Sequence, residues 1–221
     1  MNNEALKLNN DAIKVLLVDD HAVVRAGYQM FLSNSKEIEV VSEASSGENA
    51  CKAYVDSEPD VVVMDLSLPG MGGLEAIKRI IARDPNAKIL VFTMHENIVF
   101  VEQSLQAGAR GYITKSSSPE MLVQGIKAVA QGQTMIQPEI AQELAFQKTR
   151  GDDSILSELS TREFEIFCLI AQGLNTSEIA KRISISYKTV ANYSTQIKNK
   201  LGVSTVADIA RIAIRHNVIE V

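Results

Sequence analysis

The sequence is poor in cysteine and contains no long hydrophobic run. Its two cysteines, Cys51 and Cys168, lie far apart and form neither a metal-ligand spacing nor a redox motif. The longest apolar runs, such as residues 61–64, are far shorter than the roughly 20 residues of a transmembrane helix. Residues 1–13 lack the apolar core of a signal peptide. These absences predict a protein of the reducing cytosol that makes no use of a membrane.

The composition is that of an ordinary globular protein. Hydrophobic residues make up 46% of the 221 residues and charged residues 22%. Such values exclude a disordered chain, a collagen-like repeat and a coiled-coil rod. The length is sufficient for one or two domains with a substantial hydrophobic core.

The net charge of −5 is unevenly distributed along the chain. Residues 1–150 contain 14 Lys and Arg against 19 Asp and Glu, whereas residues 151–221 contain eight of each. Within residues 175–215, seven basic side chains face only two acidic ones. This asymmetry indicates two domains with different partners, and a solvated basic face without a partner is the alternative.

The front half alternates short β-branched runs with segments of helical periodicity. Five apolar runs with the composition of buried strands occupy residues 14–19, 38–43, 60–65, 88–93 and 111–114. Segments with helical spacing follow them at residues 21–33, 47–57, 73–83, 96–107 and 119–131. Apolar strands that alternate with amphipathic helices predict a parallel sheet covered on both faces. The expected fold class is therefore α/β, a flavodoxin-like doubly wound parallel sheet.

The back half shows helical periodicity only. A helical stretch at residues 138–147 precedes a polar, glycine-containing segment at residues 148–154, which is the best linker candidate. Four helices are expected after it, with Ser160, Thr176 and Ser186 as the caps of the first three. A short helix, a tight turn and a longer basic helix are typical of a helix-turn-helix unit. The predicted divisions are a tail (1–13), the α/β domain (14–134), a helical linker (135–154) and a small all-α domain (155–221).

Polar side chains stand at the C-terminal ends of four expected strands. Asp19 and Asp20 end the first strand, Asp65 ends the third, and Thr93 and Lys115 end two others. In an open α/β sheet these ends surround the crevice where ligands bind. Converging carboxylates need a cation, and oxygen ligands favour Mg²⁺. Acid, metal, hydroxyl and ammonium together are what phosphoryl transfer requires, although any one of them alone would rather indicate a helix cap or a surface charge.

The three histidines give weaker signals. His21 follows the acidic pair, where it either lines the mouth of the crevice or caps a helix. His95 and His216 have no partner at ligand spacing and are predicted to be surface residues.

Several segments resemble a known protein family. Those similar to the signature of a response-regulator receiver domain are Val18–His21, Met64–Gly70, Phe92–Met94 and Gly108–Lys115. Those similar to a LuxR-type DNA-binding domain are Leu159–Glu163, Ile170–Gly173, Glu178–Ala180, Lys188–Val190 and Lys200–Val203. Over nearly everything after residue 13, the chain resembles the NarL/FixJ family of two-component transcription factors. Within that family, residues 140–144 and 191–193 are most similar to the GacA/UvrY-type regulators.

The resemblance implies roles for the residues of the front domain. Asp65 would be the phosphoacceptor, served by a sensor histidine kinase, a phosphotransfer protein or a small phosphodonor. Asp20 and Asp65 would bind Mg²⁺ through their carboxylates together with the Ser67 carbonyl, and Asp19 would act mainly through a metal-bound water. Lys115 would pair with the phosphoryl group.

The resemblance also implies a switch pair and shows one departure. The Thr93 hydroxyl would move to a phosphoryl oxygen, and the Tyr112 ring would swing inward to fill the space. Ser116 stands where many family members have proline after the lysine. Because a cis bond to a residue other than proline is costly, the resemblance does not fix the geometry of this loop.

For the back domain, the resemblance implies a homodimer on double-stranded promoter DNA, formed when the front domain is phosphorylated. The recognition helix is expected at residues 187–200, with Lys188 and Asn192 toward base edges and Val190 and Ile197 toward the core. The residues expected to contact phosphate or sugar are Lys181, Arg182, Thr189, Tyr193, Gln196, Lys198 and Lys200. Residues 205–216 are expected to form the dimer contact.

Three alternatives compete with a phosphorylation-controlled transcription factor. A phosphatase of the haloacid-dehalogenase type also uses an aspartyl-phosphate, but it needs an Asp-x-Asp motif and Ser67 stands in place of its second aspartate. In the second alternative the front domain is a pseudo-receiver that only mediates contacts, and such a domain would not need Asp19, Asp20 and Asp65. In the third, the back domain is a helical dimerisation module that does not bind DNA. We therefore predict a transcription factor that accepts a phosphoryl group without turning over a substrate. Its unphosphorylated front domain is expected to cover the recognition helix or to hold the chain monomeric.

Overall fold

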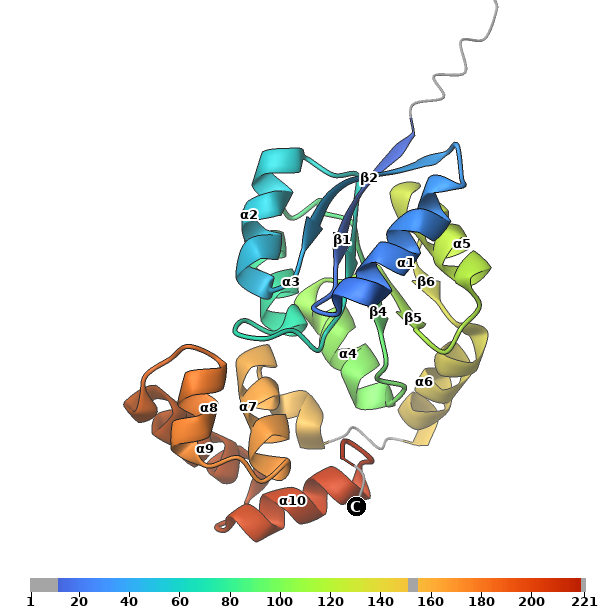
Figure 1. Cartoon of the computed structure of the whole chain (residues 1–221). Helices are drawn as coiled ribbons and strands as arrows, with labels where there is room; N and C mark the ends of the chain where they lie inside the picture. Colours follow the sequence, from blue (N-terminus) through green and yellow to red (C-terminus); the bar gives the residue numbers. More distant parts are fainter. Residues whose placement is uncertain (1–11, 151–154, 220–221) are drawn as a thin grey trace, which may run out of the picture.

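The computed structural model describes residues 12–150 and 155–219, with side chains left out for 147–150. Figure 1 shows two parts, a sheet flanked by helices and, below it, a cluster of helices coloured orange to red. Within the described ranges, no helix is long and apolar enough to cross a membrane. The predicted tail lies outside these ranges except for residues 12 and 13, and so do residues 151–154 of the predicted linker.

The front part is a six-stranded sheet in which every neighbouring pair is parallel. Its strands are β1 (Ile13–Val18), β2 (Ile38–Ala44), β3 (Val61–Met64), β4 (Ile89–Thr93), β5 (Gly111–Thr114) and β6 (Met135–Ile136). The spatial order is β2-β1-β3-β4-β5-β6. The strand order therefore reverses between β1 and β3, and the crevice for ligands lies beyond the C-terminal ends of these two strands.

Helices cover both faces of the sheet, as the unbroken apolar strands predict. They are α1 (Ala22–Ser33), α2 (Gly47–Ser57), α3 (Gly73–Arg83), α4 (Ile98–Ala107), α5 (Pro119–Ala130) and α6 (Pro138–Arg150). Alternate residues of β1 enter different cores, because successive side chains of a strand point to opposite faces. Val15 and Leu17 pack in the core beneath α1 and α5, whereas Leu16 and Val18 pack in the core beneath α2, α3 and α4.

The predicted fold class is confirmed, and the five predicted strand–helix units have their ends within two residues of the observed ones. Two features differ. The short strand β6 extends the sheet into the range assigned to the linker, and α6 continues to Arg150. A strand of two residues carries too little periodicity to be recognised in a sequence.

Within residues 155–219, the back part consists of one 3₁₀ turn and four helices. These are η1 (Ile155–Glu158), α7 (Thr161–Ala171), α8 (Thr176–Arg182), α9 (Tyr187–Leu201) and α10 (Val206–Arg215). The predicted capping box of Ser160 with Glu163 is present. The predicted cap of α8 is wrong, because Asn175 accepts the backbone hydrogen bonds and Thr176 is the first helical residue. Glu178 stands three residues after Asn175 and completes the capping box, which decides between two suitable cap residues.

Candidate functional site

The predicted acidic pocket is assembled at the C-terminal edge of the sheet. Asp19 and Asp20 follow β1, Asp65 follows β3, Thr93 is the last residue of β4 and Lys115 follows β5. Nζ of Lys115 lies 2.6 Å from Oδ2 of Asp19 and 2.6 Å from Oδ2 of Asp65. Asp19 and Asp65 are only 2% and 3% exposed. The structure thus brings an ammonium group between two buried carboxylates from other strands.

The backbone explains why Asp65 holds its place. Its N–H donates to the carbonyl of Val18 at 3.0 Å, which continues the β1–β3 pairing one residue beyond the strand. The chain then turns back so closely that a Cβ on Gly73 would lie 2.1 Å from the carbonyl oxygen of Asp65. Glycine is required at this crossing, because any side chain would collide with the backbone that carries the candidate phosphoacceptor.

Lys115 supplies the positive charge that offsets the burial of the Asp19 and Asp65 carboxylates. Burial alone lowers the pKa of its amine, but the hydrogen bonds to Asp19 and Asp65 act the other way, and the pKa is raised overall. Buried carboxylates without such a partner would carry a large desolvation penalty. Lys115 is therefore charged in the resting pocket and forms ion pairs with Asp19 and Asp65.

The donor set of the pocket fits a hard cation. Asp19, Asp20 and His21 each place a possible ligand atom within 4.8 Å of the others. Oδ1 of Asp20 is buried and accepts no hydrogen bond, although Nδ1 of His21 lies 2.8 Å away. An unsatisfied buried carboxylate oxygen is an atom that a divalent cation would bind. Asp65 is not a member of this close group, and its Oδ2 lies 2.6 Å from Nζ of Lys115.

The predicted switch residues lie side by side on adjacent strands. Thr93 and Tyr112 are both fully buried. The Tyr112 hydroxyl donates to the carbonyl of His95 at 2.8 Å, and Oγ1 of Thr93 lies 3.5 Å from the His95 N–H nitrogen. Burial raises the pKa of the Tyr112 phenol. The inward position expected for the tyrosine ring is already present here.

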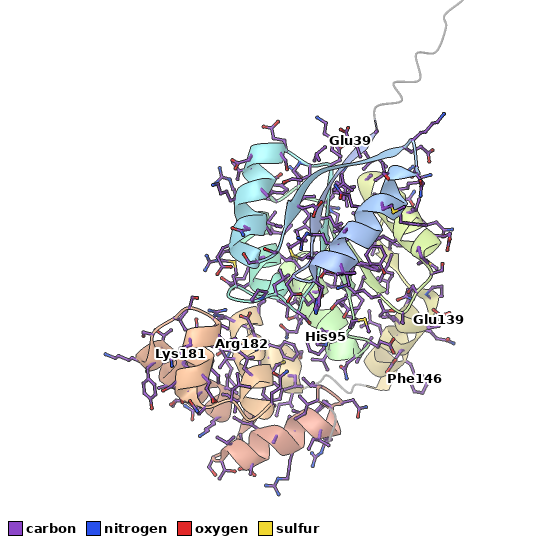
Figure 2. All side chains as sticks on the ribbon, viewed as in Figure 1. Glu39, His95, Glu139, Phe146, Lys181 and Arg182 are labelled. Carbon is purple, nitrogen blue, oxygen red and sulfur yellow. The ribbon has the colours of Figure 1, made fainter. Side chains whose placement is uncertain are left out.

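His95 is not the surface residue that its isolation in the sequence predicts. Its ring stacks on Phe100 with 3.9 Å between ring centroids, and its Nε2 lies 3.0 Å from Oγ of Ser67. Burial lowers the pKa of this imidazole. Figure 2 shows His95 at the edge of the front domain that faces the back domain. Its position two residues after Thr93, at the same sheet edge as the aspartates, was a signal that could have placed it near the pocket.

His21 lies at the mouth of the pocket, one of the two positions that the sequence left open. It occupies the N-cap position of α1, but its side chain makes no capping hydrogen bond. Its side chain is 66% exposed beside Asp20.

The loop after β5 is held by side chains that the sequence did not single out. The described residues contain no cis peptide bond, so Ser116 follows Lys115 through a trans bond. Oγ of Ser116 donates to Oε1 of Glu96 at 2.7 Å. Gln137, between β6 and α6, accepts from the Thr114 N–H at 2.9 Å and donates to Oγ of Ser117 at 2.6 Å. This network fixes the loop that follows Lys115.

The predicted recognition helix α9 presents a polar face to solvent. Val190 and Ile197 are 1% and 0% exposed, as predicted, and anchor α9 to the core. Lys188 and Asn192 are exposed, and within the described residues no hydrogen bond or ion pair engages their side chains. The other predicted contacts divide into exposed residues (Lys181, Arg182, Gln196 and Lys200) and half-buried ones (Thr189, Tyr193 and Lys198).

Lys200 differs from the other exposed basic residues because it is already engaged within the back domain. Its Nζ lies 2.6 Å from Oε2 of Glu163 and 3.1 Å from the carbonyl of Glu158. Burial tends to raise the pKa of Glu163, but the hydrogen bonds from Lys200 and Ser160 lower it overall. Lys200 therefore fastens the end of α9 to the capping box of α7.

The two domains are docked, but not over the recognition helix. The Gly72 N–H donates to Oε1 of Glu165 at 2.9 Å, and the Gly70 N–H donates to the carbonyl of Arg182 at 3.1 Å. Phe100 and Phe164 meet edge to face, and a cavity of about 140 Å³ lies between the domains. Lys181 and Arg182 end α8 at this side (Figure 2). The front domain contacts α7, η1, the end of α8 and the residues that follow α10, and it leaves Lys188 and Asn192 of α9 exposed. The first of the two expected devices, a front domain that covers the recognition helix, is therefore not what the docked arrangement shows.

Comparisons with known proteins agree with this two-domain arrangement. Residues 15–127 match the family model of the response regulator receiver domain, and residues 157–213 match that of bacterial regulatory proteins of the luxR family. The chain is 39% identical over 210 residues to the response regulator GacA of Pseudomonas aeruginosa, covering 94% of this chain and 98% of that protein. It is 39% identical over 206 residues to the response regulator UvrY of Escherichia coli, covering 92% and 94%.

Solved structures give the same result. RcsB of Salmonella enterica, determined on a promoter with the phosphomimetic BeF₃⁻, matches with a TM-score of 0.69 at 26% identity and covers 91% of this chain and 98% of that one. A LuxR-family two-component response regulator from Aurantimonas is 44% identical with a TM-score of 0.61, covering 63% and 99%. The chain therefore belongs to the NarL/FixJ family of two-component response regulators, in which a receiver domain precedes a LuxR-type helix-turn-helix domain.

Proposed function

We propose that the chain is a transcription factor controlled by phosphorylation of Asp65. The observation that carries this proposal is the position of Oδ2 of Asp65, 2.6 Å from the Lys115 ammonium in a buried pocket that also holds Thr93. A nucleophilic carboxylate with positive charge and a hydroxyl donor beside it is suited to receive a phosphoryl group. Asp65 accepts one phosphoryl group in each cycle, so the chain is a switch and not a turnover enzyme.

The chemical step transfers phosphorus from nitrogen to oxygen. A carboxylate oxygen of Asp65 attacks the phosphorus of a phosphohistidine on a sensor kinase or phosphotransfer protein. The P–N bond breaks, and its electron pair returns to the imidazole ring, which takes up a proton from solvent. The Lys115 ammonium then donates to the phosphoryl group, and the Thr93 hydroxyl turns to another of its oxygens.

Mg²⁺ is the cofactor that these residues would hold. Asp20 and Asp65 would bind it through their carboxylates, with the Ser67 carbonyl as a third ligand and Asp19 acting through water. The unsatisfied Oδ1 of Asp20 supports this assignment. A divalent cation held by these residues would supply positive charge next to the phosphoryl oxygens.

The test of the site is phosphorylation of the purified chain by acetyl phosphate with Mg²⁺. Asp65→Asn should abolish the label, because it removes the carboxylate that we propose as the nucleophile. Asp56→Asn, which changes an exposed aspartate at the end of α2, is the matched control and should label like the wild type. Labelling that survives in Asp65→Asn would show that the phosphoacceptor lies elsewhere.

The proposed output is binding of double-stranded promoter DNA by a homodimer in the cytoplasm. RcsB, a structural relative, has been determined on promoter DNA. The exposed polar face of α9 has the character of a recognition helix, with Lys188 and Asn192 toward base edges. α10 exposes Val206 and Ile214, two apolar side chains that suit the contact with a second copy. Phosphorylation then shifts the population from docked monomers toward DNA-competent dimers.

A further inference from the structure

Asn97 joins the receiver to the end of α10 by hydrogen bonds. It is the N-cap of α4, where its Oδ1 accepts the Val99 N–H at 2.8 Å. The other end of the same carboxamide reaches the back domain, because Nδ2 donates to the carbonyl of His216 at 2.6 Å and to that of Asn217 at 2.9 Å. Figure 1 shows the end of α10 below the near end of α4. One side chain thus caps two helices from different domains.

The two carbonyls are available because of how α10 ends. Asn217 has a left-handed backbone with a φ of 52°, and the Val218 N–H donates to the carbonyl of Ala213 at 2.8 Å. This C-terminal motif satisfies carbonyls inside the helix and leaves those of His216 and Asn217 facing outward. They stand at the negative end of the helix dipole, where a donor is favourable. The amide of Asn97 supplies that donor with both of its hydrogens.

The position of Asn97 depends on the phosphorylation pocket. Only residues 94–96 separate it from Thr93, the hydroxyl expected to move to a phosphoryl oxygen. His95 stands in the middle of this loop, where its N–H lies 3.5 Å from Oγ1 of Thr93 and its carbonyl accepts from the Tyr112 hydroxyl. If Thr93 turns toward the pocket, it leaves the His95 N–H, and the loop that positions Asn97 loses one of its two attachments to the switch pair.

We propose that Asn97 is a positioning residue that holds α10 to the receiver until phosphorylation moves the loop. This inference rests on the proposed function, since it assumes phosphorylation at Asp65 and pairing of two chains through α10. In the unphosphorylated chain, the double cap fixes the end of α10 against α4. Movement of the loop withdraws the carboxamide and frees α10 to meet a second copy, while α9 remains exposed throughout.

The test separates the two caps of Asn97 in the full-length chain. Asn97→Ser keeps an oxygen that can cap α4 but has no amide to reach α10, whereas Asn97→Ala loses both functions. The measurements are affinity for one promoter fragment at one salt concentration and self-association, each with and without acetyl phosphate. Both variants should tighten DNA binding of the unphosphorylated chain by about tenfold, the factor expected from losing two ordinary hydrogen bonds of the docked state. Affinity after phosphorylation and the extent of labelling should not change.

Other outcomes overturn the proposal in distinguishable ways. If Asn97→Ala tightens binding and Asn97→Ser does not, the effect comes from the cap of α4 and not from the contact with α10. If neither variant reduces the difference in promoter affinity between the unphosphorylated and the phosphorylated chain, α10 is not held by Asn97. If the wild type itself labels at Asp65 but shows no difference between states, the proposed switch fails and this inference fails with it.

Discussion

The receiver pocket and the polar face of α9 place their functional side chains in opposite ways. In the pocket, the charged groups are buried and bound to one another, with Lys115 held by Asp19 and Asp65. On α9, Lys188 and Asn192 stand in solvent without a partner among the described residues. The pocket has its geometry before any ligand arrives, whereas the helix face acquires its contacts only from a partner. Replacing one polar residue with alanine should therefore lower the stability of the fold in the pocket, whereas on α9 it should change DNA binding.

Removing the ammonium group from the pocket should have the largest effect on stability. Lys115→Ala leaves two buried carboxylates facing each other, and breaking a buried ion pair by removing one partner costs about 3–5 kcal/mol. The free energy of unfolding of the receiver, measured with urea, should fall by an amount in that range. Added Mg²⁺ should restore more stability to this variant than to the wild type. Lys52→Ala, which changes an exposed lysine of α2, is the control and should change little. Equal costs for the two variants would show that the pocket is not held together by Lys115.

Truncating the α9 face should leave stability nearly unchanged and alter the choice of DNA sequence. Lys188→Ala and Asn192→Ala each remove a candidate base contact, worth about 1–3 kcal/mol of discrimination. Selection from a randomised half-site should show relaxed preference at particular positions, with a smaller loss of non-specific binding. Sites should be inverted repeats, since a two-fold dimer imposes its symmetry on the DNA. An unchanged preference in the double variant would exclude this face as the reading surface.

Lys181 and Lys200 provide a direct comparison between a free and an engaged basic residue. The sequence predicts phosphate contacts for both, but Lys200 is bound to Glu163 whereas no ion pair within the described residues involves Lys181. Lys181→Ala should weaken binding to all sequences alike and reduce the salt slope by about one unit. Lys200→Ala should change the slope less and lower the stability of the back domain instead. A larger change of slope for Lys200→Ala would mean that it leaves Glu163 when DNA binds.

The smallest expected effect is on the acid stability of the back domain. The pKa of Glu163 is lowered in the folded chain, so its contribution is present above the ordinary carboxyl pKa of 4.5 and is lost as the pH falls through the lowered folded value. Glu163→Gln should therefore reduce stability at neutral pH and flatten its decline in acid. Glu178→Gln is the matched control, because Glu178 completes the capping box of α8 but has no lysine partner among the described residues. The measurement is the thermal unfolding temperature of the wild type and of both variants from pH 3 to pH 7.

The pocket was predictable because it follows from topology. Charged residues that end apolar strands of a parallel sheet must meet at one edge, and Asp19, Asp65 and Lys115 do so without information from any distant segment. The cap of α8 was predictable as well, since Glu178 stands three residues after Asn175 and not after Thr176. There the spacing in the sequence is sufficient to identify the cap.

The docked interface could not be predicted in the same way. Asn97 and Glu165 acquire partners from the other domain, which lies far away in the sequence, so no local periodicity identifies those partners. Lys200 and Glu163 meet within the back domain, but they lie on different helices 37 residues apart in the sequence, so helical periodicity does not indicate their contact either. Local pattern determines which face of a helix is buried, but it does not determine which exposed groups a second domain will contact.

Gly72 shows what the docked interface means for exchanging parts between related proteins. A Cβ at this position would lie 2.1 Å from Oε1 of Glu165, the atom that accepts the Gly72 N–H. The glycine belongs to the receiver, yet the side chain that would have to move to admit a Cβ there belongs to the other domain. A chimera that joins this receiver to a relative's DNA-binding domain would keep the glycine but could lose the carboxylate that it accommodates. Both sides of this contact would have to be transferred together for a hybrid regulator to remain docked in its resting state.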